Sequence, residues 1–568
     1  MVVAAALPAS AQVDFSGNWA PRFHEDQPER VPGPEVGDYL ALPSTDPARA
    51  HGQAWSASLL TLPEHQCKPH PVGYGYRGPS NMRVQQEIDP LTQRVVKITV
   101  HLQWMEQFRE IWMDGRPHPP AYAPHTWQGF STGKWEGDTL VVTTTHMKQG
   151  WVRRNGIWYS DYATFTDRFT RHGDVLSHVA IMEDPLILTE PYIRTTNWVS
   201  NPSQVIEPYP CTIVDEVAGH QLGQVPHYLP GTNTMLNDFA RKFGLNPAWA
   251  EGGAHTMYPE FRTLTRAPAP ARPITRPAPP SEIKVQPVQG NVYMLVGAGA
   301  NVAVQVGPDG VLVVDTGAMA ASQRLLAAIG ALAPGKTIRY VVNTSADAEH
   351  TGGNTAVASA GETATGGDVR QALGANSAVG AVVIAHENAQ AAMVRANRDV
   401  SAWPTETFFT AKKEIFFNGE GIQILHAPNA HGDADVMVYF RKSDVLVAGE
   451  LFSTDTYPII GEAGTINGIV TALNQMIDIS IPREKQEGGT FVIPGRGRVV
   501  DEAEIVDYRD MLTIIRDRVQ DMARKRMTLE QVLAARPAYE YDDRWSGEGA
   551  AASRGFIEAA YRSLRPRP

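Results

Sequence analysis

The chain has 568 residues and a formal net charge of −11. This length exceeds what one ordinary hydrophobic core supports, so we expect two or three domains. The acidic balance argues against nucleic acid as the main partner, because phosphate binding requires clustered Lys and Arg. The sequence contains no run of about 18 apolar residues and therefore predicts no membrane span.

The first segment, residues 1–12, has small residues at Ala9 and Ala11 in an A-x-A pattern after a short apolar run. This pattern is typical of the end of a secretory signal, although a basic leader region is lacking, and a plain Ala-rich tail is the alternative. We expect export, which places the protein in the periplasm or outside the cell. In such an oxidising compartment Cys67 and Cys211 could form one disulfide; two buried free thiols are the alternative.

Residues 13–215 predict an antiparallel β-domain, built as a sheet or a barrel. Three segments alternate in polarity with the period of a strand: 94–102, 139–145 and 162–169. Turn-forming dipeptides such as Asp114-Gly115 separate the strands. The segments 111–119 and 133–142 resemble an uncharacterised β-rich domain of exported bacterial proteins, a resemblance that implies no known chemistry.

A helical segment followed by a Pro-rich linker is expected over residues 216–282. The clearest helix is 233–243, with Asn233 or Thr234 as its N-cap. Residues 266–280 are rich in proline. Proline has no N–H donor and favours extended backbone geometry, so this stretch is expected to be a linker. The linker separates two regions of different composition.

Residues 283–500 alternate strands and helices. A helix is expected at 320–332, and strands are expected at 301–306, 311–315, 338–343, 381–385, 421–425, 436–440 and 445–448. Residues 501–568 predict further helices, most clearly 505–524 and 529–535. These last helices could cover the preceding domain or form the contact of a homo-oligomer.

The most informative stretch is Tyr340–Asn354, which reads Y-V-V-N-T-S-A-D-A-E-H-T-G-G-N. It resembles the metal-binding loop of the metallo-β-lactamase superfamily, Y-V-V-N-T-H-x-H-x-D-H-T-G-G-N. Ser345, Asp347 and Glu349 replace two histidines and an aspartate of that loop, and His350 is retained. The resemblance implies an αβ/βα sandwich, in which two sheets face each other and helices cover the outer faces.

Four further motifs of this superfamily have counterparts in the chain. Asp315 in Asp-Thr-Gly matches an aspartate that mostly orients the loop, and His431 matches a metal ligand, one residue farther from His426 than usual. Glu450 replaces an aspartate that follows a strand. Arg496, in Pro-Gly-Arg-Gly, replaces the last histidine.

The resemblance leaves two interpretations of the site. One divalent ion of Zn, Fe or Mn could be bound by His350, His431 and one or two of the carboxylates Asp347, Glu349 and Glu450. Alternatively the site is metal-free. Arg496 then supplies positive charge to the carboxylates, and the histidines are available for proton transfer.

The implied function is an exported hydrolase that acts on an ester, lactone or amide of a small-molecule substrate. Asp347 or Glu349 would orient the attacking water, and Arg496 would bind an anionic group. Ser345 would donate a hydrogen bond or act as a nucleophile. A metal-independent lyase or isomerase with the same acid–base residues is one alternative, and a non-catalytic periplasmic binding protein is another.

Two aromatic residues extend the predicted site. Trp403 and Tyr457 lie in segments that line the substrate pocket in members of the superfamily. Packing in the hydrophobic core is the alternative for both.

Overall fold

The computed structural model describes residues 13–22, 35–77, 81–258, 280–363, 380–483, 488–547 and 549–565. The chain folds into two compact units. The first contains Met1–Pro120, His125–His220 and Pro226–Thr275, and the second contains Ala121–Pro124, Gln221–Val225 and Arg276–Pro568. The expected signal segment 1–12 and nearly all of the Pro-rich stretch, 266–279, lie outside the described residues.

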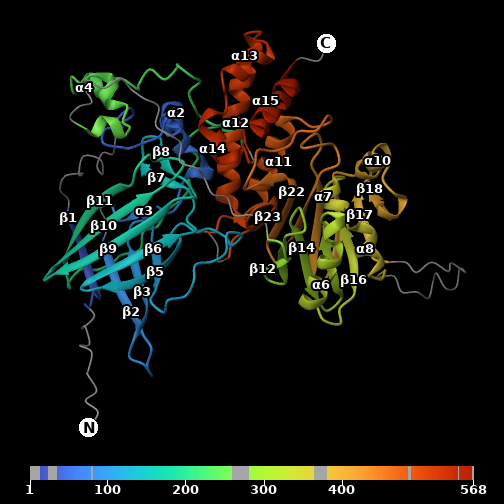
Figure 1. Ribbon diagram of the computed structural model, residues 1–568, viewed down its shortest axis with the longest axis horizontal. Helices are drawn as coiled ribbons and strands as arrows, with labels where there is room; N and C mark the ends of the chain where they lie inside the picture. Colours follow the sequence, from blue (N-terminus) through green and yellow to red (C-terminus); the bar gives the residue numbers. More distant parts are fainter. Residues whose placement is uncertain are drawn as a thin grey trace, which may run out of the picture. The chain divides into compact units, whose positions relative to one another are not determined.

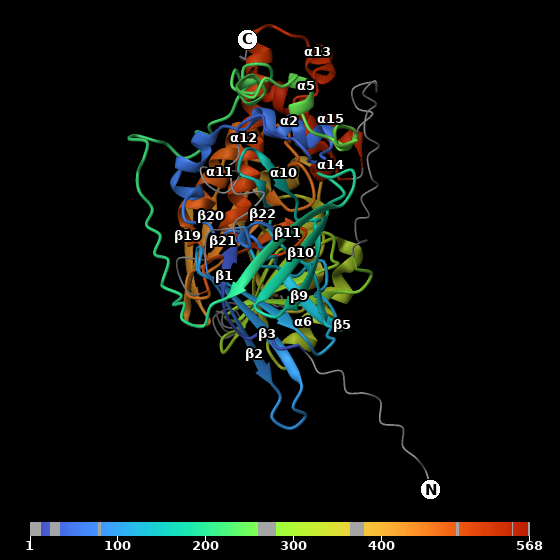
Figure 2. The same ribbon diagram turned by 90° about the vertical axis from the view of Figure 1, so that its left-hand side faces the viewer.

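The N-terminal unit is built on a closed β-barrel with the strand order β1-β11-β10-β9-β6-β5-β4-β3-β2 (Figures 1 and 2). Its strands are β1 Gly17–Arg22, β2 Met82–Ile88, β3 Val95–Leu102, β4 Gln107–Trp112, β5 Phe130–Glu136, β6 Thr139–Thr145, β9 Thr164–His172, β10 Val175–Glu183 and β11 Tyr192–Ser200. Strands β4 and β5 pair in parallel, at Ile111 with Ser131 and Trp112 with Thr132. The predicted antiparallel domain is therefore a barrel with one parallel pair, which the long connection 113–129 permits.

The barrel interior combines aromatic side chains with one buried ion pair. Trp19 and Trp198 are almost completely buried. Arg109 Nη2 lies 2.6 Å from Asp167 Oδ2, and His178 Nε2 lies 2.7 Å from the other carboxylate oxygen. Charged groups at this depth persist only when paired, so these three residues form a fixed polar layer inside the barrel.

Shorter elements and a disulfide complete this unit. The helices α2 (Asp46–Ala54) and α3 (Val72–Gly75) and the hairpin of β7 (Gly150–Arg153) and β8 (Ile157–Tyr159) pack onto the barrel core. Cys67 and Cys211 form a disulfide with their Cα atoms 5.6 Å apart. This pairing resolves the two alternatives left by the sequence.

In the described part of the expected helical segment, residues 216–258, the chain forms mainly turns and irregular stretches. Its described helices are only one or two turns long: α4 Asp238–Lys242, α5 Pro247–Ala250 and the 3₁₀ turn Ala254–Met257. The expected helix 233–243 begins only at Asp238. The Asn233 side chain accepts a hydrogen bond from Met235 N at 3.0 Å, and such a local turn competes with helix formation.

The C-terminal unit contains two facing sheets. The first has the order β12-β13-β14-β15-β16-β17-β18, and the second has the order β19-β20-β21-β22-β23-β24. The strands are β12 Lys284–Gln289, β13 Val292–Val296, β14 Val302–Gly307, β15 Gly310–Val314, β16 Ile338–Val342, β17 Val382–His386, β18 Glu406–Phe408, β19 Lys412–Phe417, β20 Glu420–His426, β21 Val436–Phe440, β22 Val445–Ser453, β23 Phe491–Arg496 and β24 Val500–Asp501.

Alternation along the strands explains the layers of this unit. In β15, Leu312 and Val314 face the second sheet, whereas Val311 and Val313 face outward beneath helices. A strand buried on both faces reads as a continuous apolar run. Helices α6 (Ser322–Leu332) and α8 (Asn354–Ser359) cover the outer face of the first sheet.

The outer face of the second sheet is covered by C-terminal helices (Figure 1). These are α11 Ile466–Ile479, α12 Glu502–Arg524, α13 Leu529–Ala534, α14 Tyr539–Trp545 and α15 Ala550–Leu564. The predicted αβ/βα sandwich is thus confirmed. No helix in the described part of the chain is long and apolar enough to cross a membrane.

Candidate active site

The candidate site lies where several strands of the C-terminal unit end. Asp315 directly follows β15, and β16 leads into the loop that holds α7 (Ala348–Thr351). His431 lies in the loop after β20. Glu450 is part of β22, and Arg496 ends β23. Both sheets therefore contribute charged side chains to one cluster.

Asp315 fixes the loop that follows β16. Its backbone has a left-handed φ of +64°, a conformation that aspartate tolerates better than most residues. Its carboxylate accepts hydrogen bonds from Thr344 N at 2.8 Å and from Thr344 Oγ1 at 2.6 Å. Within the loop, the side-chain amides of Asn343 and Asn354 donate to each other at 3.0 and 2.8 Å. The frame of the loop is therefore a hydrogen-bonded scaffold.

His350 lies between two carboxylates. Its Nδ1 is 2.7 Å from Asp315 Oδ2, and its Nε2 is 2.7 Å from Glu450 Oε1. Burial acts to lower the pKa of His350, but the charges and hydrogen bonds of Asp315 and Glu450 outweigh it and raise the pKa to about 10. The ring is therefore an imidazolium at neutral pH, and each of its two N–H groups donates a hydrogen bond to one of these carboxylates.

Arg496 extends this chain of opposite charges toward solvent. Its Nη2 lies 3.5 Å from Glu450 Oε1 and also donates to the half-exposed Glu349. Burial acts to raise the pKa of Glu450, but the hydrogen bond from His350 and the charges of His350 and Arg496 lower it to about 2. Asp315, His350, Glu450, Arg496 and Glu349 thus alternate anion and cation.

His431 forms a second pairing. Its Nδ1 lies 3.2 Å from Oδ1 of Asp435, and its Nε2 lies 3.4 Å from Oδ2 of Asp347. Asp435 is 1% exposed and also accepts the backbone N–H of Gly432 at 2.7 Å. Burial acts to lower the pKa of His431, but the hydrogen bond and charge of Asp435 and the charges of Asp347 and Glu450 raise it to about 9.

Sequence reasoning missed the role of Asp435. The residue lies only four positions after His431, in the run His-Gly-Asp-Ala-Asp, and that proximity was the available signal. Because the Asp435 carboxylate is buried against Nδ1, it fixes the orientation of the imidazole and directs Nε2 toward the exposed Asp347.

The remaining predicted site residues contact other partners. Ser345 is buried, and its Oγ accepts the backbone N–H of Asp347 at 3.2 Å. Trp403 donates its indole N–H to Arg398 O at 3.1 Å. Tyr457 is buried among the C-terminal helices, where its hydroxyl donates to Asp542 Oδ1 at 3.2 Å and its ring stacks on Phe556. Tyr457 is thus a core residue, as the alternative interpretation held.

The donor set does not fit a metal ion. His350 uses both ring nitrogens as donors to carboxylates, which leaves neither lone pair for a metal, and Arg496 adds a positive charge beside Glu450. Four residues were expected to share a metal ion: Asp347, His350, His431 and Glu450. They do not form a group that could bind one. Among the described residues, no set of three or more His, Cys, Asp and Glu side chains could hold a metal ion.

The sandwich and the frame of its loops define a known class of domain. Residues 285–492 match the family model of the metallo-beta-lactamase superfamily. The C-terminal unit therefore contains a domain of this superfamily over these residues. A search of curated proteins gave no match to the chain.

Comparison with solved structures gives matches of low identity and low TM-score. The inverting sec-alkylsulfatase Pisa1 from Pseudomonas sp. is 15% identical with a TM-score of 0.37, over 49% of this chain and 50% of that one. DIM-1 metallo-beta-lactamase is 15% identical with a TM-score of 0.30, over 42% of this chain and 98% of that one. A metallo-beta-lactamase from Pontibacter korlensis is 15% identical with a TM-score of 0.30, over 41% and 99%. The chain spans about half the length of the alkylsulfatase.

Proposed function

We propose that the C-terminal unit is a metal-independent hydrolase in which ion pairs within the protein occupy the positions of metal ligands. The observation that carries this proposal is His350, whose two nitrogens each lie 2.7 Å from a carboxylate oxygen. Those contacts supply positive charge to Asp315 and Glu450 from the protein itself. A buried pair of carboxylates without a cation would instead take up protons.

The reacting groups would be His431 and Asp347. The Asp347 carboxylate is 49% exposed and accepts a proton from a water molecule, whose oxygen attacks the carbonyl carbon of an ester, lactone or amide. The His431 imidazolium donates its Nε2 proton to the leaving oxygen or nitrogen. Asp435 stabilises that imidazolium, as an orienting carboxylate does in other acid–base pairs.

The test is hydrolysis of a panel of small esters, lactones and amides by the full chain after exhaustive chelation. Elemental mass spectrometry of the same preparation determines its metal content. We expect turnover without metal, and a loss of about 10²- to 10⁴-fold in His431→Asn, the range of general acid–base catalysis. The exposed His172→Asn is the control and should keep full activity. Activity that requires one equivalent of zinc, iron or manganese would overturn the proposal.

A non-catalytic binding protein is the second candidate, and the closed centre of the site favours it. His350 is fully buried in its ion pairs and can contact no substrate directly. No turnover on any member of the panel would support this candidate. Products without the added elements of water would instead indicate a lyase or isomerase that uses the same residues.

We also propose that the protein is exported. The disulfide between Cys67 and Cys211 supports this location, because structural disulfides persist in oxidising compartments. Thiol titration of the protein isolated from its native cells, after fractionation, tests the proposal. A cytosolic protein with two free thiols would contradict it.

A further inference from the structure

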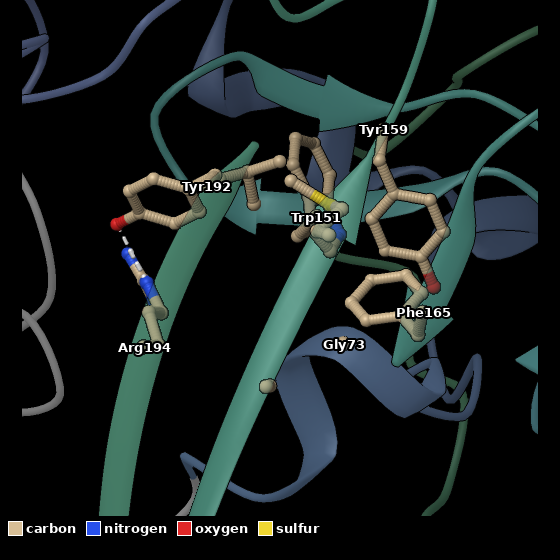
Figure 3. Close-up of a pocket in the computed structure, with 9 residues that line it drawn as sticks. Gly73, Trp151, Tyr159, Phe165, Tyr192 and Arg194 are labelled. Atoms are coloured by element: carbon tan, nitrogen blue, oxygen red, sulfur yellow. Dashed lines mark hydrogen bonds between the residues drawn. The ribbon is translucent and has the colours of Figure 1, made fainter. Parts of the chain in front are cut away.

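Aromatic side chains of the N-terminal unit pack around a small pocket (Figure 3). Trp151 and Tyr159 from the β7–β8 hairpin lie there beside Phe165 of β9 and Tyr192 of β11. The pocket has room for about one water molecule, so these rings contribute packing and bind no larger group. Two stacked rings in the C-terminal unit differ from them, because each of those rings can take up a proton.

His386 and His426 form this stack in the C-terminal unit. Their ring centres lie 3.7 Å apart, and the planes of the rings differ by 8°. His386 ends β17 of the first sheet, and His426 ends β20 of the second. His386 is 3% exposed, and the ring of Phe408 in β18 packs against it edge-on at 5.2 Å. The stack therefore links the two sheets where these strands end.

The contacts of His386 require its neutral form. His386 is the N-cap of α10 (Glu387–Arg395), and its Nδ1 accepts the backbone N–H of Asn388 at 3.3 Å. A proton on Nδ1 would replace this acceptor by a donor. It would also put a positive charge at a helix N-terminus, where the helix dipole disfavours cations. The neutral ring carries its proton on Nε2, which is buried and has no hydrogen-bond partner among the described residues.

The surroundings of His386 disfavour its protonation on balance. Burial makes the largest contribution, and His426 of β20 follows, because its ring would place a second positive charge against the first. From β18, the neighbour is the uncharged ring of Phe408. Glu387 of α10 and Asp433 of the loop after β20 act in the opposite direction. The net result is a pKa of His386 below its ordinary value.

The same residues hold the loop that carries His431. His426 Nε2 donates to Asp433 O at 3.0 Å. Asn388 Nδ2 donates to the same oxygen at 2.9 Å and to Asp433 Oδ2 at 3.0 Å. Asp433 lies two positions after His431. One carbonyl of the loop is therefore held both by a ring of the stack and by the residue whose N–H bonds to His386.

We propose that the stack of His386 on His426 is a pH-sensitive lock on the loop 427–435. While His386 is neutral, the stack and the N-cap of α10 keep Asn388 and the loop in place. When His386 takes up a proton in mildly acidic solution, the cap and the stack are lost and the loop opens. The proposal concerns the position of the loop and does not depend on the reaction proposed for the site.

His386 has a different pKa in the closed and in the open loop. In the open loop the ring is in water and has an ordinary pKa of about 6.5, whereas the closed lock lowers the pKa. The closed form is therefore most stable above about pH 6.5 and loses stability as the pH falls below that value. Opening should become about 5- to 10-fold more frequent between about pH 7.5 and about pH 5.5. His431 stays charged throughout this range, because its pKa is about 9.

Hydrogen–deuterium exchange of the full chain tests the proposal. The peptide that spans loop 427–435 is followed by mass spectrometry at several pH values, and its protection is expressed relative to the intrinsic exchange rate at each pH. We expect this protection to fall about 5- to 10-fold between about pH 7.5 and about pH 5.5. Helix α6, measured in the same samples, should keep its protection. An equal fall in α6 would show general loosening and overturn the proposed lock.

Variants separate His386 from the other titrating groups. His386→Asn keeps an N-cap acceptor for the N–H of Asn388 and removes the titratable ring, so protection of the loop should no longer depend on pH. His172→Asn, at an exposed histidine, is the matched control and should keep the wild-type fall. His426→Gln removes the second ring but keeps a donor for Asp433 O, and should move the fall in protection to higher pH.

Two results would overturn the proposal. One is a wild-type loop whose protection stays constant across this pH range, and this measurement decides alone if the variants do not fold. The other is an unchanged fall of protection in His386→Asn.

Discussion

His350 and His431 each lie between two carboxylates, and this placement sets their charge. A buried imidazole without such neighbours loses its proton, because burial disfavours the charged form. Here the carboxylates of Asp315 and Glu450 outweigh burial at His350, and Asp435 and Asp347 do so at His431. Both rings therefore act as cations within the protein.

Removing the charge of His350 should destabilise the C-terminal unit. His350→Gln leaves the buried Asp315 and Glu450 without their shared cation, at a cost of about 3–5 kcal/mol in the free energy of unfolding. Urea denaturation measures this change. The double variant His350→Gln/Glu450→Gln should lose less than the sum of the two single variants, because it also removes one unpaired charge. His172→Gln, at an exposed histidine, is the control. If His350→Gln is as stable as this control, the ion-pair role of His350 is contradicted.

The barrel ion pair predicts a pH dependence of stability. Burial acts to raise the pKa of Asp167, but the charge of Arg109 and the hydrogen bond and charge of His178 lower it to about 2 from its usual 3.8. A carboxyl group whose pKa is lower in the folded state stabilises above its unfolded pKa, and this contribution is lost as pH falls. The contribution should be about 2 kcal/mol and disappear between about pH 4 and pH 2.

The measurement is urea unfolding of the wild type and Asp167→Asn across this acid range. Near pH 6 the variant should be several kcal/mol less stable, because it leaves the buried Arg109 charge without its partner. As the pH falls from about 4 to about 2 the stability difference should shrink, because Asp167 in the folded protein becomes protonated near pH 2 and then resembles asparagine. A stability difference that stays constant down to pH 2 would rule out this explanation.

At the scale of elements, helix α11 supports the loop that carries His431. Thr465 at its N-terminus donates its backbone N–H to Asn429 O at 2.9 Å and to Ala430 O at 3.0 Å. A Cβ atom at Gly468 would lie 1.9 Å from Asn429 O. Glycine at this position therefore allows the loop backbone to lie directly on the helix.

Gly468→Ala should displace this loop and destabilise the protein by about 1–3 kcal/mol, the usual cost of overpacking. Gly330→Ala in α6 is the matched control, since a Cβ there would have no heavy atom within 4 Å. That control should stabilise the protein by about 0.5–1 kcal/mol through helix propensity. Thermal unfolding of both variants measures these two changes in stability. Equal changes would show that helix propensity alone determines the effect and that the contact with Asn429 does not matter.

For the molecule as a whole, the disulfide is a constraint on the N-terminal unit. Cys67 and Cys211 are 144 residues apart, and closing so long a loop restricts the unfolded chain. Replacing both cysteines by serine should lower the stability of this unit by about 2–5 kcal/mol. Urea unfolding, followed by hydrogen exchange in each unit, should locate the loss in the N-terminal unit. A loss confined to the C-terminal unit would contradict this prediction.

The sequence by itself determined part of the strands, the long C-terminal helices and the superfamily frame of the site loops. These features depend on local signals: period-two alternation, apolar runs and helix-capping residues. Such signals can be recognised without knowing which distant segments pack against them. The start of the 233–243 helix was missed, because the Asn233 turn offers the same backbone another hydrogen bond. The sequence also predicted which residues lie near the site, because each superfamily motif follows the end of a strand.

Only the tertiary structure decided the chemistry of those residues. His350 meets Asp315 across 35 positions and Glu450 across 100, and Tyr457 meets Asp542 across 85. Whether a histidine binds a metal or donates to carboxylates depends on where both ring nitrogens point, which spacing along the chain does not specify. The aromatic pocket of the barrel likewise arises from strands brought together by register. Charge and shape at a site are properties of these long-range contacts.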